Sequence, residues 1–216
     1  MNLETSLSNA ICGHEHQRMR LARLLHTNRL PQSMIFAGPT GIGKSLVAAE
    51  LVQTIFCDKG SAQTYGGCGE CKSCHLFAVG NHPDLHLVDC NQWKVDQVRE
   101  LLSALALKSY EGRARAVIFN DAEQLNTQSL NALLKTLEEP RPDTYFVLVT
   151  SNPAKLLQTV LSRCHKFHFD PLTAAEVELL ITKGNIETGE LTLKEITLLS
   201  DGSMENIEKL SEHAAT

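Results

Sequence analysis

The sequence contains no long apolar run and no apolar segment near its start. A membrane-spanning helix needs about 18 to 20 consecutive apolar residues, and no run of that length occurs. Residues Met1 to His16 are polar and lack the apolar stretch of a secretory signal peptide. We therefore expect a cytoplasmic protein that has no membrane partner.

An excess of positive charge is also missing. The formal net charge is −5, so no global basic field attracts nucleic acid, and any DNA contact must come from a local patch or through a partner. There is no internal repeat and no low-complexity linker. The 216 residues, 43% of them hydrophobic, suffice for one large domain or for a medium domain followed by a small one.

Cysteine is not rare, but four of the seven cysteines gather in one glycine-rich segment, residues 57–74. A two-residue gap lets consecutive thiolates turn onto one ion, and a longer gap lets a fourth complete a tetrahedron. This clustering favours a metal over disulfides in a reducing compartment. We predict a closed, structural Zn²⁺ site, with the neighbouring His75 as a less favoured ligand. The predicted ligands are Cys57, Cys68, Cys71 and Cys74.

The segment from Met34 to Ser45 reads as an apolar strand, a glycine-rich turn and the start of a helix. It fills the pattern G-x-x-x-x-G-K-[ST], in which backbone N–H groups converge on phosphates. Lys44 adds a positive charge, the Ser45 hydroxyl can meet Mg²⁺, and the helix adds its positive dipole end. We predict that this loop binds ATP or ADP with Mg²⁺. The expected contacts are Gly38, Thr40, Gly41, Gly43, Lys44 and Ser45.

Strand and helix patterns alternate up to Asp170-Pro171, which predicts a parallel, three-layer α/β sheet with ligands at the carboxyl ends of its strands. After that point only helices are expected, starting near Thr173, Thr192 and Ser203. We thus expect a nucleotide-binding domain over residues 1–170, with the cysteine insert at 57–74, and a small helical lid over 171–216. Strands are expected near residues 34–37, 85–88, 113–119, 145–150 and 165–169, and helices near 15–30, 44–56, 95–105, 126–139 and 156–161. In the first helix, Arg18, Arg20 and Arg23 are expected on a solvated face, with phosphate contact as the alternative.

Several motifs occur together along residues 11–204: the phosphate loop, the four cysteines, His82-Pro83-Asp84-Leu85, Val95-Asp96-Gln97-Val98-Arg99, Asn131 to Pro140, and Ser162-Arg163-Cys164. This combination resembles the AAA+ clamp-loader ATPases of bacterial DNA polymerase III, and most closely their delta-prime type. The resemblance implies an AAA+ P-loop NTPase sheet followed by a helical lid. Family members carry a third, helical collar domain, which we expect to be absent because the sequence stops at Thr216.

The resemblance also implies a role in DNA replication. In this family, five subunits open a ring-shaped sliding clamp and place it on primed DNA, with ATP bound at the subunit interfaces. The implied partners are gamma/tau and delta subunits and the sliding clamp, with primed DNA bound through the assembled complex of the polymerase (nucleotidyltransferase) holoenzyme. Arg163 is implied to reach the γ-phosphate of a neighbouring subunit in trans, a role that suits a planar and permanently charged guanidinium.

The sequence departs from an active member at the end of the Walker B strand. An acting ATPase needs an Asp to hold Mg²⁺ and a Glu to position water, but alignment from Asn131 places Asn120 and Asp121 there. Ser151 falls at the position of a polar contact to the nucleotide, and Glu205 stands where motor subunits carry a lid arginine. We expect weak nucleotide binding or binding without hydrolysis, with Arg163 serving a neighbour.

Other interpretations stay open. A gamma/tau-type active ATPase would require Asp121 to take over Mg²⁺ binding. A zinc-containing nucleotide kinase fits the phosphate loop and the cysteines, but no arginine-rich acceptor site follows. A zinc-finger DNA reader is disfavoured, because Lys59 and Lys72 are the only basic residues of the insert.

Overall fold

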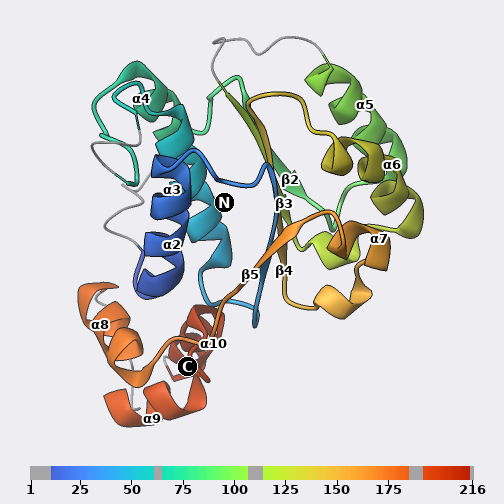
Figure 1. The fold of residues 1–216 in the computed structure, drawn as a ribbon. Coiled ribbons are helices and arrows are strands. Elements are labelled where there is room, and N and C mark those ends of the chain that lie inside the picture. The colour runs from blue at the N-terminus through green and yellow to red at the C-terminus, as the bar shows by residue number, and fades with distance from the viewer. Residues whose placement is uncertain (1–10, 61–64, 107–113, 185–191, 215–216) are drawn as a thin grey trace.

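A parallel five-stranded sheet runs through the described part of the molecule, with strand order β2-β3-β4-β1-β5 (Figure 1). The computed structural model describes residues 11–60, 65–106, 114–184 and 192–214. All four pairings between neighbouring strands are parallel, which confirms the predicted α/β class. The strands are β1 (Ser33–Ala37), β2 (Leu85–Asp89), β3 (Arg115–Asn120), β4 (Thr144–Thr150) and β5 (His165–His168).

Helices cover both faces of the sheet and make the three layers (Figure 1). One face carries α2 (Glu15–His26), α3 (Lys44–Phe56) and α4 (Lys72–Ala78), and the other carries α5 (Val95–Leu105), α6 (Thr127–Glu138) and α7 (Gln158–Leu161). Along β1, Met34 and Phe36 pack with the first group of helices, while Ile35 and Ala37 pack with the second. A strand buried on both faces reads as a continuous apolar run, as β1 does.

The strand register brings the predicted site residues to one edge of the sheet. Ala37 at the end of β1 pairs with Thr150 and with His168, and Phe119 of β3 pairs with Leu148. Two short 3₁₀ helices, Ala122–Gln124 and Pro153–Lys155, follow β3 and β4. The phosphate loop, Asn120 and Ser151 therefore all leave the sheet at its carboxyl edge, where ligands of such sheets bind.

The C-terminal part forms a separate helical layer below the sheet in Figure 1. It comprises α8 (Ala174–Gly184), α9 (Leu193–Leu199) and α10 (Met204–Ala214). Capping boxes predicted from sequence are present: the hydroxyls of Thr173 and Thr192 each cap a helix whose third residue is a glutamate. These helices share a small core of Leu172, Val177, Ile181, Ile196 and Ile207. None of the described helices is both long enough and apolar enough to cross a membrane.

Two helices differ from expectation. The first ends at His26 rather than near Leu30, because the Thr27 hydroxyl donates to the Arg23 carbonyl at 2.8 Å and Asn28 adopts φ +53°. Helix α4 was not predicted: its cap is the thiol of Cys71, which accepts from the Cys74 amide at 3.4 Å. Parts of the predicted elements lie outside the described residues, namely residues 1–10 and 107–113 of the first domain, 61–64 of the insert, and 185–191 and 215–216 of the lid. Residue 113 was the expected start of the strand over 113–119.

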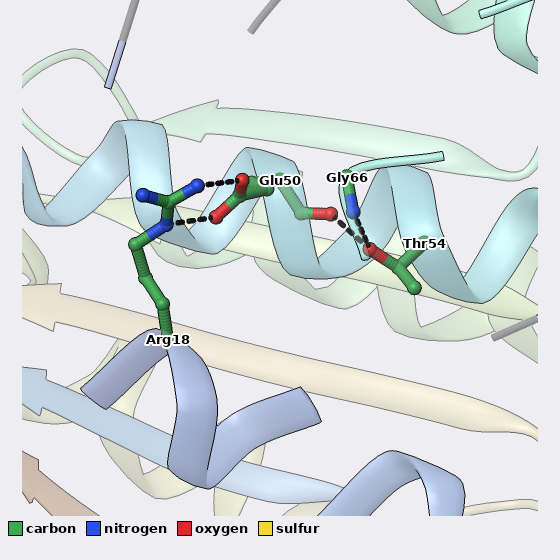
Figure 2. Close-up of polar contacts among 4 residues, drawn as sticks. All are labelled: Arg18, Glu50, Thr54 and Gly66. Atoms are coloured by element: carbon green, nitrogen blue, oxygen red, sulfur yellow. Dashed lines mark hydrogen bonds and ion pairs between the residues drawn. The ribbon is translucent and has the colours of Figure 1, made fainter. Parts of the chain in front are cut away.

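Helix α3 is tied to its neighbours by buried polar contacts (Figure 2). Arg18 of α2 donates to Glu50 through Nε at 2.8 Å and Nη2 at 2.5 Å, and the Glu50 side chain is fully buried. One turn later, the Thr54 hydroxyl donates to the Glu50 carbonyl at 2.7 Å and accepts from the Gly66 amide at 2.8 Å. The prediction that Arg18 lies on a solvated face, or contacts phosphate, is therefore wrong. Arg18 joins α2 to α3 instead.

Candidate functional site

The phosphate loop connects β1 to α3 and takes its shape from its glycines. Gly43, at φ +96°, immediately precedes α3, and no atom lies within 4 Å of where its Cβ would stand. This open face leaves room for a phosphate against the backbone. Gly38 is required for another reason: a Cβ there would lie 2.2 Å from the carbonyl oxygen of Phe169. Close packing of the loop against the residue after β5 therefore demands a glycine at this position.

The two polar side chains that start α3 both have partners within the chain. Lys44 is buried, and its ammonium donates to the Pro39 carbonyl of its own loop. Burial lowers the pKa of Lys44, while the nearby carboxylates of Glu123 and Asp121 act in the opposite direction. The Ser45 hydroxyl donates to the Asn120 side-chain oxygen at 2.7 Å. The structure thus brings together the serine and the asparagine that the sequence placed at the Mg²⁺ position.

A cavity of about 290 Å³ opens beside this loop. Its size lies at the lower end of the range of ligand pockets. Three parts of the chain surround it: the loop, the ends of β3 and β4, and the first turns of α10. The lining residues are Thr40, Gly41, Gly43, Lys44, Ser45, Leu46, Asp121, Val149, Thr150, Ser151, Met204, Glu205 and Glu208.

The end of β3 carries the acidic groups of the site. Asp121 adopts φ +53°, lines the cavity, and accepts from the Asn91 amide at 3.1 Å. Glu123 accepts from the Ser151 amide at 3.0 Å and from the Ser151 hydroxyl. Burial by itself would raise the pKa of Glu123. The hydrogen bonds that Glu123 accepts, above all the one from the Ser151 hydroxyl, have a larger effect and lower its pKa below the usual value. Glu123 is therefore an ionised partner of Ser151.

These groups can hold phosphate but make a weak metal site. Ser45 is bonded to the neutral amide of Asn120, where a carboxylate oxygen would bind Mg²⁺ more strongly. Asp121, whose side chain is one carbon shorter than that of glutamate, is held on one side by Asn91. A water molecule positioned for attack would need a base in hydrogen-bond reach, and Glu123, the glutamate two residues after Asp121, is engaged by Ser151.

Arg163 lies at the opposite edge of the sheet, in the turn between α7 and β5. Its Nε donates to Glu138 at 2.8 Å and its Nη1 donates to the Thr159 carbonyl at 3.0 Å. The side chain keeps 30% of its surface exposed. It borders an open hollow of about 480 Å³ that is also lined by Ser33 and His165, the first residues of β1 and β5. The guanidinium is therefore outside the core, where another molecule can approach it.

The four cysteines of the insert form one group. Their sulfur atoms all lie within 4.8 Å of one another, and four ligands at a zinc–sulfur distance of about 2.3 Å would be about 3.8 Å apart. The amides of Asp58 and Cys74 each donate to the Cys71 sulfur at 3.4 Å. A hydrogen bond from the backbone of Glu70 lowers the pKa of the Cys68 thiol to about 6, whereas burial raises the pKa of the Cys57 and Cys74 thiols. The case for a metal site therefore rests on the positions of the four sulfurs. These residues can hold a tetrahedral metal ion, whereas His75 is exposed and outside the group.

Two partners of the site were missed from sequence. Asn91 contacts Asp121 across 30 positions of the chain, and Glu138 contacts Arg163 across 25. Neither residue belongs to a pattern with a chemical meaning of its own. The turn after β2 and the end of α6 could be located from sequence, but which side chains they face depends on strand order.

Comparison with known proteins now adds to this geometry. A family model described as DNA polymerase III, delta subunit, matches residues 13–173. The delta' subunit of DNA polymerase III from Pseudomonas aeruginosa is 38% identical over 171 residues, which are 77% of this chain and 51% of that protein. The tau/gamma subunit from Haemophilus influenzae is 34% identical over 209 residues, which are 94% of this chain and 30% of that protein. The chain thus spans between about a third and a half of the length of these relatives.

Solved structures show the same fold. The RuvB Holliday junction branch migration motor of Thermotoga maritima superimposes with a TM-score of 0.62, covering 98% of this chain and 65% of that one. At 16% sequence identity, this likeness concerns the arrangement of sheet, helices and lid.

Proposed function

The chain belongs to the AAA+ clamp-loader family of DNA polymerase III subunits, and from this membership we propose that it acts as a delta-prime-type subunit. In this role it joins gamma/tau and delta subunits, and the assembled complex loads the sliding clamp on primed DNA. Arg163 then serves as an arginine finger on the nucleotide of a neighbouring subunit. The chain's own phosphate loop holds ATP or ADP with Mg²⁺ without hydrolysing it at a useful rate.

One observation carries this proposal: the position of Arg163. An arginine finger must leave its own subunit and present donors to a phosphate, for which the guanidinium is suited by shape and permanent charge. Arg163 is partly exposed beside an open hollow, and two of its nitrogens are held by Glu138 and Thr159. Since it lies at the edge opposite the phosphate loop, its target is another molecule's phosphate rather than its own.

The groups around the phosphate loop support the proposal that the chain holds a nucleotide without hydrolysing it at a useful rate. Asn120, which bonds Ser45, brings no negative charge to the Mg²⁺ position. Asp121 is engaged by Asn91, and Ser151 is engaged by Glu123.

In the cysteine insert, we propose a structural Zn²⁺ bound by all four thiolates, which leaves the ion no open position for catalysis.

The test is the ATPase rate of a reconstituted clamp-loader complex that contains this chain. Arg163→Ala should lower the rate by about 10³-fold, the usual range for an arginine finger, and Arg163→Lys should restore little because it lacks the planar fork. Arg29→Ala, which removes an exposed arginine that lines neither this hollow nor the phosphate cavity, is the matched control and should leave the rate unchanged. Complex formation is checked by gel filtration. An unchanged rate in Arg163→Ala would rule the trans role out.

A gamma/tau-type active ATPase is the second candidate. The intact loop around Lys44 and Ser45, the adjoining cavity and the tau/gamma relative favour it. It differs from the first proposal in what the isolated chain does. Steady ATP turnover by the chain alone, abolished by Lys44→Ala, would support this candidate and contradict the first.

A further inference from the structure

Two carboxylates of the helical lid line the phosphate cavity. Glu205, in the first turn of α10, accepts from the Thr40 hydroxyl of the phosphate loop at 3.3 Å. Glu208, one turn further along α10, also lines the cavity. Thr40 and Glu205 are 165 positions apart in the sequence, so this contact is a product of the fold.

The lid is held in this place by further bonds to the loop. The Met204 amide donates to the Gly41 carbonyl at 2.8 Å, and the Ser203 hydroxyl donates to the Thr40 carbonyl at 3.1 Å. A Cβ on Gly41 would stand 2.6 Å from the Cβ of Glu205, which shows how closely the two segments pack. The start of α10, which carries Glu205, therefore cannot withdraw from the loop without breaking several hydrogen bonds.

Negative charge dominates the cavity. Among the residues that line it, Lys44 is the one cation, against the carboxylates of Asp121, Glu205 and Glu208. The ammonium of Lys209 lies 2.6 Å from Glu205 and offsets part of its charge. That hydrogen bond and the charge of Lys209 also lower the pKa of Glu205, so Glu205 is ionised at neutral pH. An incoming polyphosphate thus meets like charge on the lid side of the cavity.

We propose that this cavity selects nucleoside diphosphates over triphosphates and that Glu205 is the residue that sets this preference. Each additional phosphate brings more negative charge into a small cavity that already holds three carboxylates and one ammonium. Repulsion between like charges grows as their separation falls, and two of the three carboxylates, Glu205 and Glu208, lie on the lid side of the cavity. The inference rests on the proposed function, because it assumes that the cavity holds a nucleotide.

The test compares ADP with a non-hydrolysable ATP analogue, each with excess Mg²⁺, by titration calorimetry on the full chain. The wild-type chain should bind ADP about tenfold more tightly, the factor expected for one added like-charge contact at this range. Glu205→Gln keeps the size and can still accept from Thr40, so it should tighten binding of the analogue and bring the ratio close to one. Glu178→Gln, an exposed lid carboxylate that does not line this cavity, should leave the ratio unchanged.

The outcomes separate this inference from the proposed function. Equal affinities in the wild-type chain, or a ratio that Glu205→Gln does not change, would overturn the selectivity and leave nucleotide binding and the Arg163 role intact. Failure of both nucleotides to bind would overturn the inference together with nucleotide binding by this chain, while the ATPase of the Arg163→Ala complex would still decide the trans role.

Discussion

The two edges of the sheet differ in how their polar groups are used. At the carboxyl edge, Lys44 donates to Pro39, Ser45 donates to Asn120, and Thr40 donates to Glu205 of the lid. At the amino edge, Arg163 lies beside an open hollow with 30% of its side chain exposed. Both sets have partners within the chain, but the second leaves a cation partly exposed beside an open hollow.

This difference shows how one P-loop fold can separate holding a nucleotide from acting on one. At about 3.3 Å per residue, the five residues of β1 separate the edges by about 16 Å. A change at one edge can therefore leave the other undisturbed, since sites more than about 10 Å apart that share no partners behave additively. The predictions below test that independence.

Removing the proposed zinc from the cysteine cluster should have the largest effect, which should reach the phosphate loop through α3. Helix α3 begins with Lys44 and ends at Phe56, next to the ligand Cys57, and Thr54 binds the Gly66 amide of the insert. A structural metal stabilises its fold directly, so chelation, or Cys71→Ser, should lower the melting temperature by about 10 °C. Hydrogen exchange should speed up in α3 and the phosphate loop and stay unchanged in α7 and β5.

The cysteine that lies outside the cluster and is only half-buried provides a control. Cys12→Ser should leave both the melting temperature and the zinc content, measured by atomic absorption, as in the wild-type chain. Purified protein that contains no metal and is unaffected by chelators would contradict the structural zinc. Uniformly faster exchange over the whole sheet would show instead that the two edges are coupled.

Two arginine–glutamate pairs, one buried and one exposed, should differ in how much each contributes to the free energy of unfolding. Arg18 forms two hydrogen bonds to Glu50, whose side chain is fully buried, whereas Arg163 forms one to Glu138, whose side chain is 56% exposed. Arg18→Ala leaves a buried carboxylate without its partner and should cost about 2–3 kcal/mol. Arg163→Ala should cost less than about 0.5 kcal/mol, as exposed pairs do. Urea denaturation followed by circular dichroism measures both.

A second variant separates the missing partner from the missing side chain. In Arg18→Met with Glu50→Leu no buried charge remains, and much of the lost stability should return. Equal losses in Arg18→Ala and Arg163→Ala would mean that Arg163 is part of the fold. That result would weaken its assignment to a neighbour's phosphate.

Local patterns predicted most of this molecule from sequence. The bounds of α3, Lys44–Phe56, follow from the phosphate-loop motif and the apolar stripe that continues it. The alternation of strands and helices predicted the parallel sheet, and the cysteine spacing predicted which sulfurs meet. For α3 and for the cysteine cluster the information lies within about twenty residues of chain, whereas the sheet prediction used the alternation over the whole of residues 34–169.

Contacts between distant segments could not be predicted in this way. Arg18 and Glu50 are 32 positions apart, and nothing in α2 distinguishes Arg18 from its neighbouring arginines. Helix α4 was missed because its cap is a cysteine thiol, not one of the usual Ser, Thr, Asp or Asn side chains. The need for glycine at Gly38 could be read from the phosphate-loop pattern, but its close contact with Phe169, the residue that follows β5, could not.

The smallest expected effect concerns Glu138, which we expect to position Arg163. In the described part of the chain, Glu138 and the Thr159 carbonyl hold Nε and Nη1, and Nη2 has no partner. The held guanidinium should reach a neighbour's phosphate with less loss of side-chain freedom. Glu138→Gln should therefore lower the ATPase rate of the assembled complex by about threefold, in line with the weak energy of an exposed pair.

Three comparisons make this last prediction specific. Glu139→Gln alters the next carboxylate, which has no bond to Arg163 among the described residues, and should leave the rate unchanged. Glu138→Gln combined with Arg163→Ala should be no slower than Arg163→Ala alone, because residues acting through one contact are not additive. A faster rate in Glu138→Gln would mean that the glutamate restrains the arginine, since releasing the ion pair would then free the guanidinium for its target.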